Sequence, residues 1–267
     1  MKLLIAIPAL DEEDSIEATV ERSLAARSVI VAASPVTEVE VTVVSDGSTD
    51  RTVERAARFG DRIRLIVFEH NRGYGAAIKA AWAASDADLL GFLDADGTCD
   101  PAFFAELCAT LDRAGVDVVL GSRLNEGSEM PRMRRLGNRL FAWLLRAVSS
   151  QEVSDTASGM RVVRRSCLPR LLPLPDGLHF TPAMSARVLL DDDLTLAEVA
   201  MPYHEREGES KLSAVRDGLR FLWVILRTAA LYRPARLLVP PAALCALLAA
   251  FLMLEPTIFY VENQRLH

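Results

Sequence analysis

The sequence has few cysteines, and none of them are spaced to form a metal or disulfide framework. Its 267 residues include four cysteines and no Cys-x-x-Cys pair. Scattered thiols in a chain of this length are typical of reduced residues in a cytosolic environment. We therefore expect neither a zinc site nor a disulfide bond at Cys99, Cys108, Cys167 or Cys245.

The sequence also lacks an excess of positive charge. Its 30 Lys and Arg are outnumbered by 36 Asp and Glu, which gives a net charge of −6. This balance argues against a nucleic-acid-binding protein, although the basic residues can still form local anion sites. Small anions are therefore the expected partners.

The N-terminus has no pattern of a secretory signal, and the chain has no internal repeat. The apolar run over 2–7 is too short for a signal sequence, and Pro8 and several acidic residues follow it. We expect that this portion is not exported. The length suits one medium α/β domain with an appendage.

A long uncharged run distinguishes the C-terminal part of the chain. Leu237 to Leu254 is 18 residues long, about 27 Å as a helix against a hydrocarbon core of about 30 Å. A buried core helix is the alternative, and Pro240 and Pro241 weaken a helix there. Because the run is apolar on every side, we favour a membrane span.

The residues before this run mix arginines with aromatic and aliphatic side chains, as in a helix at a membrane surface. Arg227, Arg233 and Arg236 precede the run, so the positive-inside rule places the preceding domain in the cytosol. The expected organisation is an α/β domain over 1–213, an amphipathic juxtamembrane helix over 214–234, a transmembrane segment over 235–254 and a polar tail over 255–267.

Apolar runs alternate with helical patterns through the N-terminal part. The pattern predicts strands over 2–7, 39–45, 63–68, 88–93 and 116–120, separated by helices near 14–27, 49–58, 75–84 and 101–114. This βαβ rhythm predicts an α/β fold with a mostly parallel sheet, whose ligands bind at the carboxyl ends of the strands.

Two aspartates, Asp94 and Asp96, end the strand predicted over 88–93. That strand is apolar on both faces, so it belongs inside a parallel sheet, and carboxylates at its end can bind a divalent cation. For an isolated Asp-x-Asp, a solvated acidic turn is the favoured explanation. However, polar clusters also follow the first two strands, at 8–13 and 45–50. If these strands are neighbours, the clusters line one nucleoside-diphosphate crevice; helix capping is the alternative for Glu13 and Asp50.

These motifs, in this order, resemble the family 2 glycosyltransferases, which have the GT-A (Rossmann-like) nucleotide-sugar-binding fold. The likeness is strongest to the dolichol-phosphate mannosyltransferase-like, polyprenyl-phosphate branch, and it covers about residues 3–213. The segments that carry it are Ile7–Glu13, Val44–Asp50, Asn71–Ala77, Asp94–Asp96, Gly121–Arg123, Asp155–Arg161 and Gly208–Leu212.

The resemblance implies a set of residues for the sugar donor. Those expected to hold the base and ribose are Pro8, Leu10, Glu12 and Asp46. Asp94, Ala95 and Asp96 are expected at the donor diphosphate, where the two aspartates bind Mg²⁺ or Mn²⁺. Arg206 and Lys211 resemble a flexible arm that closes on the diphosphate, with a solvated basic loop as the alternative.

A lipid-phosphate acceptor would need further cations. Two unit charges at about 5 Å repel by roughly 3 kcal/mol at an effective dielectric near 20. Arginine suits bidentate phosphate binding. The expected residues are Arg123, Arg161 and one or more of Arg132, Arg134 and Arg135. An exposed basic helix over 132–139, or a membrane-facing patch, is the alternative.

The segment 180–185 contains no carboxylate, and Met184 stands where related mannosyltransferases tend to carry a glutamate. A phosphate monoester is already largely ionised at neutral pH and needs no general base. The missing carboxylate therefore favours a phosphate acceptor over a hydroxyl acceptor.

The sequence thus predicts a metal-dependent inverting glycosyltransferase at the cytosolic face of the cell inner membrane. It would move a hexose from a GDP- or UDP-linked sugar to a polyprenyl phosphate. Three alternatives stay open: transfer to a saccharide or lipid hydroxyl, nucleotidyl transfer, and a catalytically silent nucleotide-sugar-binding scaffold.

Overall fold

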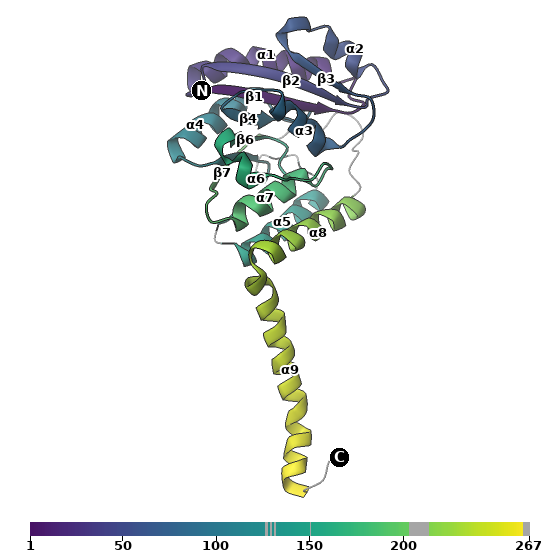
Figure 1. Ribbon diagram of the computed structural model, residues 1–267, viewed down its shortest axis with the longest axis vertical. Coiled ribbons are helices and arrows are strands. Elements are labelled where there is room, and N and C mark those ends of the chain that lie inside the picture. The colour runs from purple at the N-terminus through teal and green to yellow at the C-terminus, as the bar shows by residue number, and fades with distance from the viewer. Residues whose placement is uncertain (126–127, 129, 131, 150, 203–213, 264–267) are drawn as a thin grey trace.

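A seven-stranded sheet runs through the N-terminal part of the chain, in the order β3-β2-β1-β4-β6-β5-β7. The computed structural model describes residues 1–125, 128, 130, 132–149, 151–202 and 214–263 (Figure 1). β1 pairs in parallel with β2 and β4, whereas β6 runs antiparallel to its neighbours β4 and β5. The mostly parallel sheet predicted from the sequence is confirmed. The strands are β1 (Lys2–Ala9), β2 (Glu38–Asp46), β3 (Arg64–Phe68), β4 (Leu89–Phe92), β5 (Val118–Ser122), β6 (Arg161–Arg164) and β7 (Leu196–Ala200).

Helices cover both faces of this sheet, because its central strands bury alternate side chains on opposite sides. Leu3, Ile5 and Ile7 of β1 pack on the side of α1 and α4, and Leu4 and Ala6 pack on the side of α3 and α7. The helices of this α/β body are α1 (Ile16–Ala33), α2 (Thr52–Ala57), α3 (Tyr74–Ala83), α4 (Phe104–Ala114), α6 (Leu168–Leu171) and α7 (Phe180–Leu190), with short 3₁₀ turns η1 (Gly60–Arg62), η2 (Pro101–Phe103) and η3 (Arg165–Cys167).

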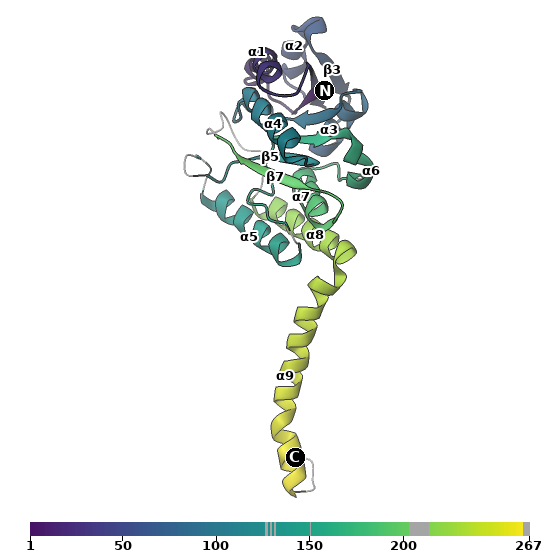
Figure 2. The same ribbon diagram turned by 90° about the vertical axis from the view of Figure 1, so that its left-hand side faces the viewer.

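Two further helices pack together below the sheet and lead to a third. α5 (Arg132–Val148) and α8 (Ala214–Tyr232) bury their inner faces with α7 in a separate apolar cluster that includes Leu145, Leu189 and Ile225. α8 begins and ends close to the bounds expected for the juxtamembrane helix. It is followed directly by α9 (Pro234–Asn263), which leaves the body as one long rod (Figures 1 and 2).

α9 is longer than the apolar run suggested. Its segment Pro234–Val261 is 28 residues long, and the most apolar window of that segment has a mean hydropathy of 2.4 and is not buried at any position. The alternative of a buried core helix is therefore wrong. The helix continues through Pro240, Pro241 and Pro256, so residues 255–263, expected to be part of a polar tail, are helical.

Candidate active site

The three polar clusters that follow β1, β2 and β4 lie at one edge of the sheet. These strands are adjacent and parallel, in the order β2-β1-β4. Their carboxyl ends therefore meet, and the loops that follow them lie together at the edge where open α/β sheets bind ligands. The condition on which the sequence argument depended, that these strands are neighbours, is met.

The loops after β1 and β2 are joined by hydrogen bonds between side chains and backbone. The Thr49 amide donates to Asp11 Oδ1 at 2.7 Å, and the Glu12 amide donates to Thr52 Oγ1 at 2.8 Å. Asp50 accepts from the Glu13 amide and also from the Thr52 amide at the start of α2. This capping role fits the alternative considered for Asp50 and fixes the loop that carries Glu12.

Asp46, at the end of β2, is 4% exposed and holds the loop that follows β3. Its two carboxylate oxygens accept from the Arg72 and Gly73 amides at 2.7 and 2.9 Å. The close approach requires a glycine at position 47, where φ is +76° and a Cβ would lie 2.5 Å from the Asn71 nitrogen. Each carboxylate oxygen has a second lone pair; the nucleoside contact expected of Asp46 from the sequence stays a prediction.

The other residues expected at the base and ribose line the same edge at different depths. Pro8 is buried, and Leu10 and Glu12 are half-buried. The Glu12 carboxylate accepts from the Ser15 hydroxyl at 3.3 Å. These positions are compatible with a nucleoside contact, which stays a prediction.

Asp94 is held from two sides. The Tyr74 hydroxyl at the start of α3 donates to Asp94 Oδ1 at 2.6 Å. On the other side lies Gly159, where a Cβ would overlap the Asp94 carboxylate. Tyr74 itself packs edge-on against Phe92 and Phe180, so an aromatic cluster fixes the phenol that orients the carboxylate.

The rest of the Asp-Ala-Asp loop is fixed by its own turn and by α1. Thr98 donates to Asp96 Oδ1 from its amide, at 3.2 Å, and from its hydroxyl, at 2.8 Å. Thr19 of α1 donates to the carbonyl of buried Ala95 at 3.0 Å. Contacts within the chain therefore fix the position of this loop, as preorganised binding of a charged group requires.

The donor set fits a divalent cation that also binds phosphate. Within the ranges described, no three His, Cys, Asp or Glu side chains are arranged to hold a metal ion, so the chain offers two carboxylates at this loop. Mg²⁺ typically binds one or two carboxylates and completes its shell with phosphate and water, and oxygen ligands suit Mn²⁺ equally. Burial, followed by the charges of Asp94 and Asp96, raises the pKa of Tyr74, which stays a neutral donor. The charges of both Asp94 and Asp96 are therefore felt at the Tyr74 hydroxyl.

A buried ion pair stands at the end of β5, on the same edge. Arg123 Nε and Nη2 donate to Asp155 at 2.7 and 2.8 Å, and the Arg123 amide donates to the same carboxylate at 3.0 Å. Asp155 is fully buried and the Arg123 side chain is 14% exposed. Burial alone would raise the pKa of Asp155, but the charge and hydrogen bonds of Arg123 hold it below its usual value. Asp155 thus fixes the orientation of Arg123.

Asn138 ties this pair to α5. Its side-chain nitrogen donates to Asp155 Oδ1 at 2.6 Å, and its oxygen accepts from the Thr156 amide and hydroxyl at 3.0 and 2.7 Å. Asn138 is 6% exposed. One side chain of α5 therefore completes the hydrogen bonding of the loop that positions Arg123.

Arg161 has a different position from the one expected. It begins β6 at the same sheet edge, but it is fully buried. Its guanidinium donates to the carbonyls of Ser158 and Thr156 and to the Ser185 hydroxyl. Burial lowers the pKa of Arg161 to about 10, so it stays a cation near neutral pH. This environment favours positioning of the 156–158 loop over contact with an acceptor.

Of the other residues expected to bind phosphate, the structure describes the side chain of Arg135 only. Arg135 of α5 donates to the Ser128 carbonyl at 2.9 Å. Arg132 and Arg134 belong to α5, but their side chains are outside the described part of the structure, as are Arg206 and Lys211. Met184 of α7 is fully buried and packs in the apolar cluster that α7 forms with α3 and the sheet.

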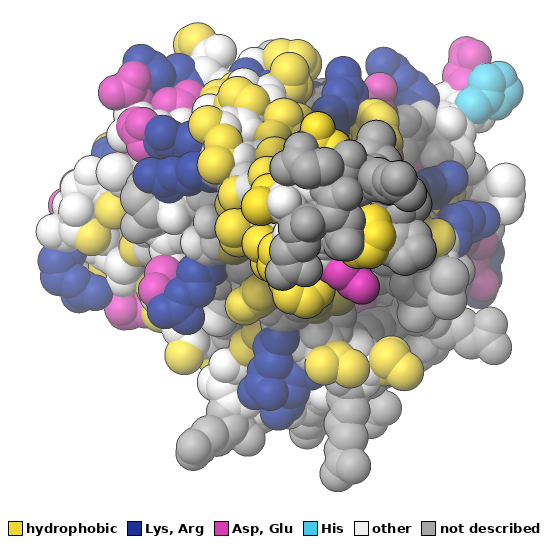
Figure 3. All heavy atoms as spheres, turned by 90° about the horizontal axis from the view of Figure 1, so that it is seen from below, with side chains coloured by type: hydrophobic (Ala, Val, Ile, Leu, Met, Phe, Trp, Pro, Cys, Tyr) yellow, Lys and Arg dark blue, Asp and Glu magenta, His cyan; other side chains and the backbone are white. Residues whose placement is uncertain are grey.

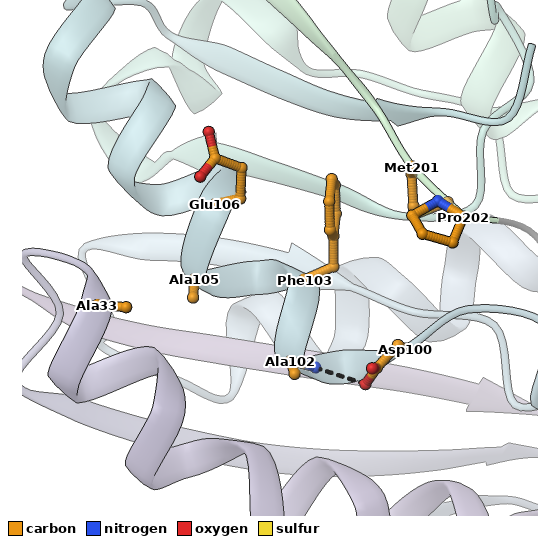
Figure 4. Close-up of a pocket in the computed structure, with 8 residues that line it drawn as sticks. All are labelled: Ala33, Asp100, Ala102, Phe103, Ala105, Glu106, Met201 and Pro202. Atoms are coloured by element: carbon orange, nitrogen blue, oxygen red, sulfur yellow. Dashed lines mark hydrogen bonds between the residues drawn. The ribbon is translucent and has the colours of Figure 1, made fainter. Parts of the chain in front are cut away.

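A separate hollow of about 330 Å³ lies beside η2 and α4 (Figure 4). Phe103, Met201 and Pro202 contribute its apolar walls, and Asp100 and Glu106 its carboxylates. None of its lining residues belongs to the three strand-end clusters. It therefore adds nothing to the site built around Asp94 and Asp96.

Three residues of the site had no role in the sequence analysis. Tyr74 and Asp155 lie within motifs that were noted, and a polar side chain inside a recurring motif is the signal that could have identified them. Asn138 gives no such signal. It stands among arginines and leucines in the sequence, and only the packing of α5 shows that it contacts Asp155 and Thr156.

Known proteins are similar to this chain in sequence and in fold. Residues 4–172 match the family described as Glycosyl transferase family 2. The chain is 36% identical over 182 residues to a dolichyl-phosphate hexose transferase of Haloferax volcanii, covering 66% of this chain and 75% of the relative. It is 26% identical over 221 residues to a dodecaprenyl-phosphate galacturonate synthase of Rhizobium johnstonii, covering 81% of this chain and 63% of the relative.

Among solved structures, the fold is similar to that of glucosyl-3-phosphoglycerate synthase from Mycobacterium tuberculosis, solved with Mn²⁺, UDP and glucosyl-3-phosphoglycerate. The TM-score is 0.66 at 23% identity, covering 85% of this chain and 79% of that one. At this identity the likeness concerns the GT-A fold alone, and the predicted fold class is confirmed.

Proposed function

Because the chain belongs to glycosyl transferase family 2, we propose that it transfers a hexose from a GDP- or UDP-linked sugar to a polyprenyl phosphate. The names of two relatives, one acting on dolichyl phosphate and one on dodecaprenyl phosphate, support this acceptor class. The observation that carries the proposal is the meeting of Asp94 and Asp96 with the β1 and β2 loops at one sheet edge.

Asp94 and Asp96 would hold Mg²⁺ or Mn²⁺ together with the donor diphosphate. When bound, such a cation offsets the negative charge that develops on the leaving diphosphate. The chain's own contribution is orientation: Tyr74 and Gly159 fix Asp94, and Thr98 fixes Asp96. Pro8, Leu10, Glu12 and Asp46 would enclose the nucleoside.

On the acceptor side, Arg123 would bind the attacking phosphate. An acceptor oxygen forms the new bond to the anomeric carbon from the face opposite the diphosphate, and the diphosphate leaves with the electron pair of the broken bond. This displacement inverts the anomeric centre. The acceptor phosphate is largely dianionic at neutral pH, so no side chain has to remove a proton.

Arg123 alone is a weak counterion, because Asp155 already balances its charge at 2.7 Å. Two anions approaching to about 5 Å repel by roughly 3 kcal/mol for each pair of unit charges. Further cations are therefore needed, and α5 carries several close in sequence to Asn138. We propose that Arg132, Arg134 or Arg135 provides them.

The acceptor is a membrane lipid, and α9 suits a membrane anchor. Its 28-residue segment would extend about 42 Å as a helix, more than the hydrocarbon thickness of about 30 Å. Arg233 and Arg236 lie at its N-terminal end. The positive-inside rule then places the α/β body on the cytosolic face.

The test is a transfer assay with the full chain in membranes. A panel of labelled GDP and UDP sugars is supplied with undecaprenyl or dolichyl phosphate, with and without EDTA. We expect lipid-extractable label that depends on the polyprenyl phosphate, is lost with EDTA and is restored by Mg²⁺ or Mn²⁺.

Other outcomes identify the alternatives. Label on a neutral saccharide or lipid with none on polyprenyl phosphate would indicate a hydroxyl acceptor, and release of pyrophosphate would indicate nucleotidyl transfer. Binding of a nucleotide sugar without turnover on any acceptor would indicate a scaffold.

A further inference from the structure

One short stretch of chain contacts both the metal loop and the arginine expected at the acceptor. It is Ser154–Arg161, and we name it the bridge segment. Near its start, the Asp155 carboxylate accepts two charge-assisted hydrogen bonds from the Arg123 guanidinium. Near its end, the Gly159 backbone lies against Asp94, where a Cβ would overlap the carboxylate. The bridge segment therefore contacts the two side chains whose ligands would have to meet.

The middle of the bridge segment is buried and bonded on several sides. Thr156 and Ser158 are fully buried. The Ser158 hydroxyl donates to the Gly121 carbonyl of β5 at 2.5 Å. Arg161 donates to the Thr156 and Ser158 carbonyls at 2.8 and 3.1 Å. Close-packed interiors transmit strain, so a shift at one end of the bridge segment is passed to the other end.

Glu198 of β7 holds the start of the bridge segment. Its Oε2 accepts from the Ser154 amide at 2.9 Å, and its Oε1 accepts from the Asp155 amide and the Ser154 hydroxyl, both at 2.8 Å. In the sheet, Glu198 is paired with Leu120 of β5, three residues before Arg123. Hydrogen bonds to an ionised acceptor are about twice as strong as neutral ones. One half-buried carboxylate thus fixes two consecutive amides beside the counterion of Arg123.

The burial of charge around the bridge segment favours a role beyond stability. Arg161 is fully buried and Glu198 is half-buried. Buried charges add little net stability compared with well-packed apolar side chains. A fully bonded polar network does, however, make a local arrangement rigid and unique. Here the anion accepts from amides of the bridge segment and the cation donates to its carbonyls, so the backbone is held from both sides.

We propose that Glu198 is a positioning residue for hexose transfer, which acts through the bridge segment to set the separation of Asp94 and Arg123. The inference rests on the proposed function, because it concerns the distance between the donor and the acceptor. Reacting atoms must be held about 3–3.5 Å apart, and a misplacement of about 1 Å can slow a reaction on the order of 100-fold. Binding of each substrate depends on its own side of the site and should change less.

Amide hydrogen exchange tests whether the bridge segment is held as one unit, whatever the substrates are. The full chain is kept in detergent, because apolar side chains gather around α9 in the view along this helix (Figure 3). Glu198→Gln keeps the size of the side chain but puts an NH₂ group where one oxygen accepts, so one backbone amide loses its partner. We expect exchange over 154–161 to become about tenfold faster, as for the loss of one charge-assisted hydrogen bond. Faster exchange confined to 154–155, with 157–160 as protected as in the wild-type chain, would overturn the inference.

The kinetic test compares Glu198→Gln with Glu40→Gln. Glu40 is a half-buried glutamate near the start of β2, and it accepts from the Ser85 hydroxyl at 2.9 Å. In the transfer assay, Glu198→Gln should lower kcat about tenfold or more and keep both KM values within about twofold. Glu40→Gln should keep all three constants. A higher KM for polyprenyl phosphate at unchanged kcat would overturn the inference, because Glu198 would then act on Arg123 alone. Unchanged constants for Glu198→Gln would overturn it as well.

Ser154→Ala is the milder variant in case Glu198→Gln does not fold. Ser154 is exposed, and alanine removes only its hydroxyl, which bonds Glu198 and Ser122. We expect kcat to be about threefold lower, again with both KM values kept; an unchanged kcat would count against the inference. A wild-type chain that gives no lipid-extractable label would contradict the proposed function, and the exchange over 157–160 would then still decide whether Glu198 positions the bridge segment.

Discussion

The region proposed to bind the donor, around β1, β2 and β4, and the region proposed to bind the acceptor, around β5 and α5, are built in different ways; we name them the donor half and the acceptor half. Around β1, β2 and β4, carboxylates are fixed mostly by backbone amides and by the turns that follow the strands, as at Asp46 and Asp96. Around β5 and α5, Arg123 is fixed by a buried side-chain network of Asp155 and Asn138. The donor half thus depends on strand order and turn geometry, and the acceptor half depends on a few side chains from distant segments.

The sharpest difference between the halves is expected at Asp96. Asp96→Ala should reduce hexose transfer by about 100-fold or more, because the leaving diphosphate loses a metal ligand worth several kcal/mol of charge stabilisation. Asp100→Asn, in an exposed part of the same loop, keeps a side-chain acceptor for the Ala102 amide at the start of η2 and should keep the rate within about twofold. Initial rates at saturating donor are the measurement, and an unchanged rate for Asp96→Ala would remove the metal from the mechanism.

The acceptor half should instead show its largest effect in stability. Asp155→Asn leaves the buried Arg123 charge without its counterion, and breaking such a pair costs about 3–5 kcal/mol. Asp176→Asn is the control, because the carboxylate of Asp176 is 66% exposed beside Lys79 and such pairs contribute about 1 kcal/mol or less. Thermal unfolding of the detergent-solubilised chain distinguishes the two variants.

The same pair predicts a pH dependence. The pKa of Asp155 is lower in the folded chain than its usual 3.8. Its contribution is therefore fully present above the unfolded pKa and is lost as the pH falls through the folded pKa. The stability difference between the wild-type chain and Asp155→Asn should narrow as the pH falls from about 3.8 through the lower pKa of Asp155 in the folded chain. A difference that widens on acidification would contradict the assigned charge state.

The KM values for the two substrates test whether Arg123 belongs to the acceptor half. Arg123→Ala should raise the KM for polyprenyl phosphate about tenfold, the loss expected for one charge-assisted hydrogen bond. The KM for the nucleotide sugar should change little, and Arg123→Lys should recover part of the loss. Equal changes in both constants would mean that Arg123 does not belong to the acceptor half.

The smallest effect is expected at Tyr74. Tyr74→Phe removes the hydrogen bond to Asp94 but keeps the aromatic packing against Phe92 and Phe180. A bond worth about 1 kcal/mol should weaken Mn²⁺ binding about fivefold. Electron paramagnetic resonance of free Mn²⁺, with the nucleoside diphosphate present, measures this without turnover. Tyr232→Phe, at the end of α8, should leave Mn²⁺ affinity unchanged.

The sequence predicted the donor half better than the acceptor half. The five predicted strands correspond to β1 through β5 within a few residues, because each is a clear apolar run. β6 was missed because Arg-Val-Val-Arg is short and charged at both ends, and β7 because Leu196–Ala200 contains a glutamate. Both gain their strand conformation from their pairing with β5.

The burial of arginines could not be predicted from the sequence. Arg123 and Arg161 stand in similar motifs, yet one is partly accessible beside Asp155 and the other is enclosed by carbonyls and Ser185. The difference arises because β6 lies between β4 and β5, which covers Arg161 on both sides. Arg206 and Lys211 lie outside the described residues, so their expected role stays a prediction.

Gly159 has a consequence for how this sequence can change. With Asp94 in place, even a methyl group at position 159 would collide with the carboxylate. A chain that lost Asp94 would lose that restriction too. The two positions, 65 residues apart in the printed sequence, should therefore be inherited as a pair: where descendants keep the acid they keep the glycine, and where the acid is replaced alanine or serine becomes admissible.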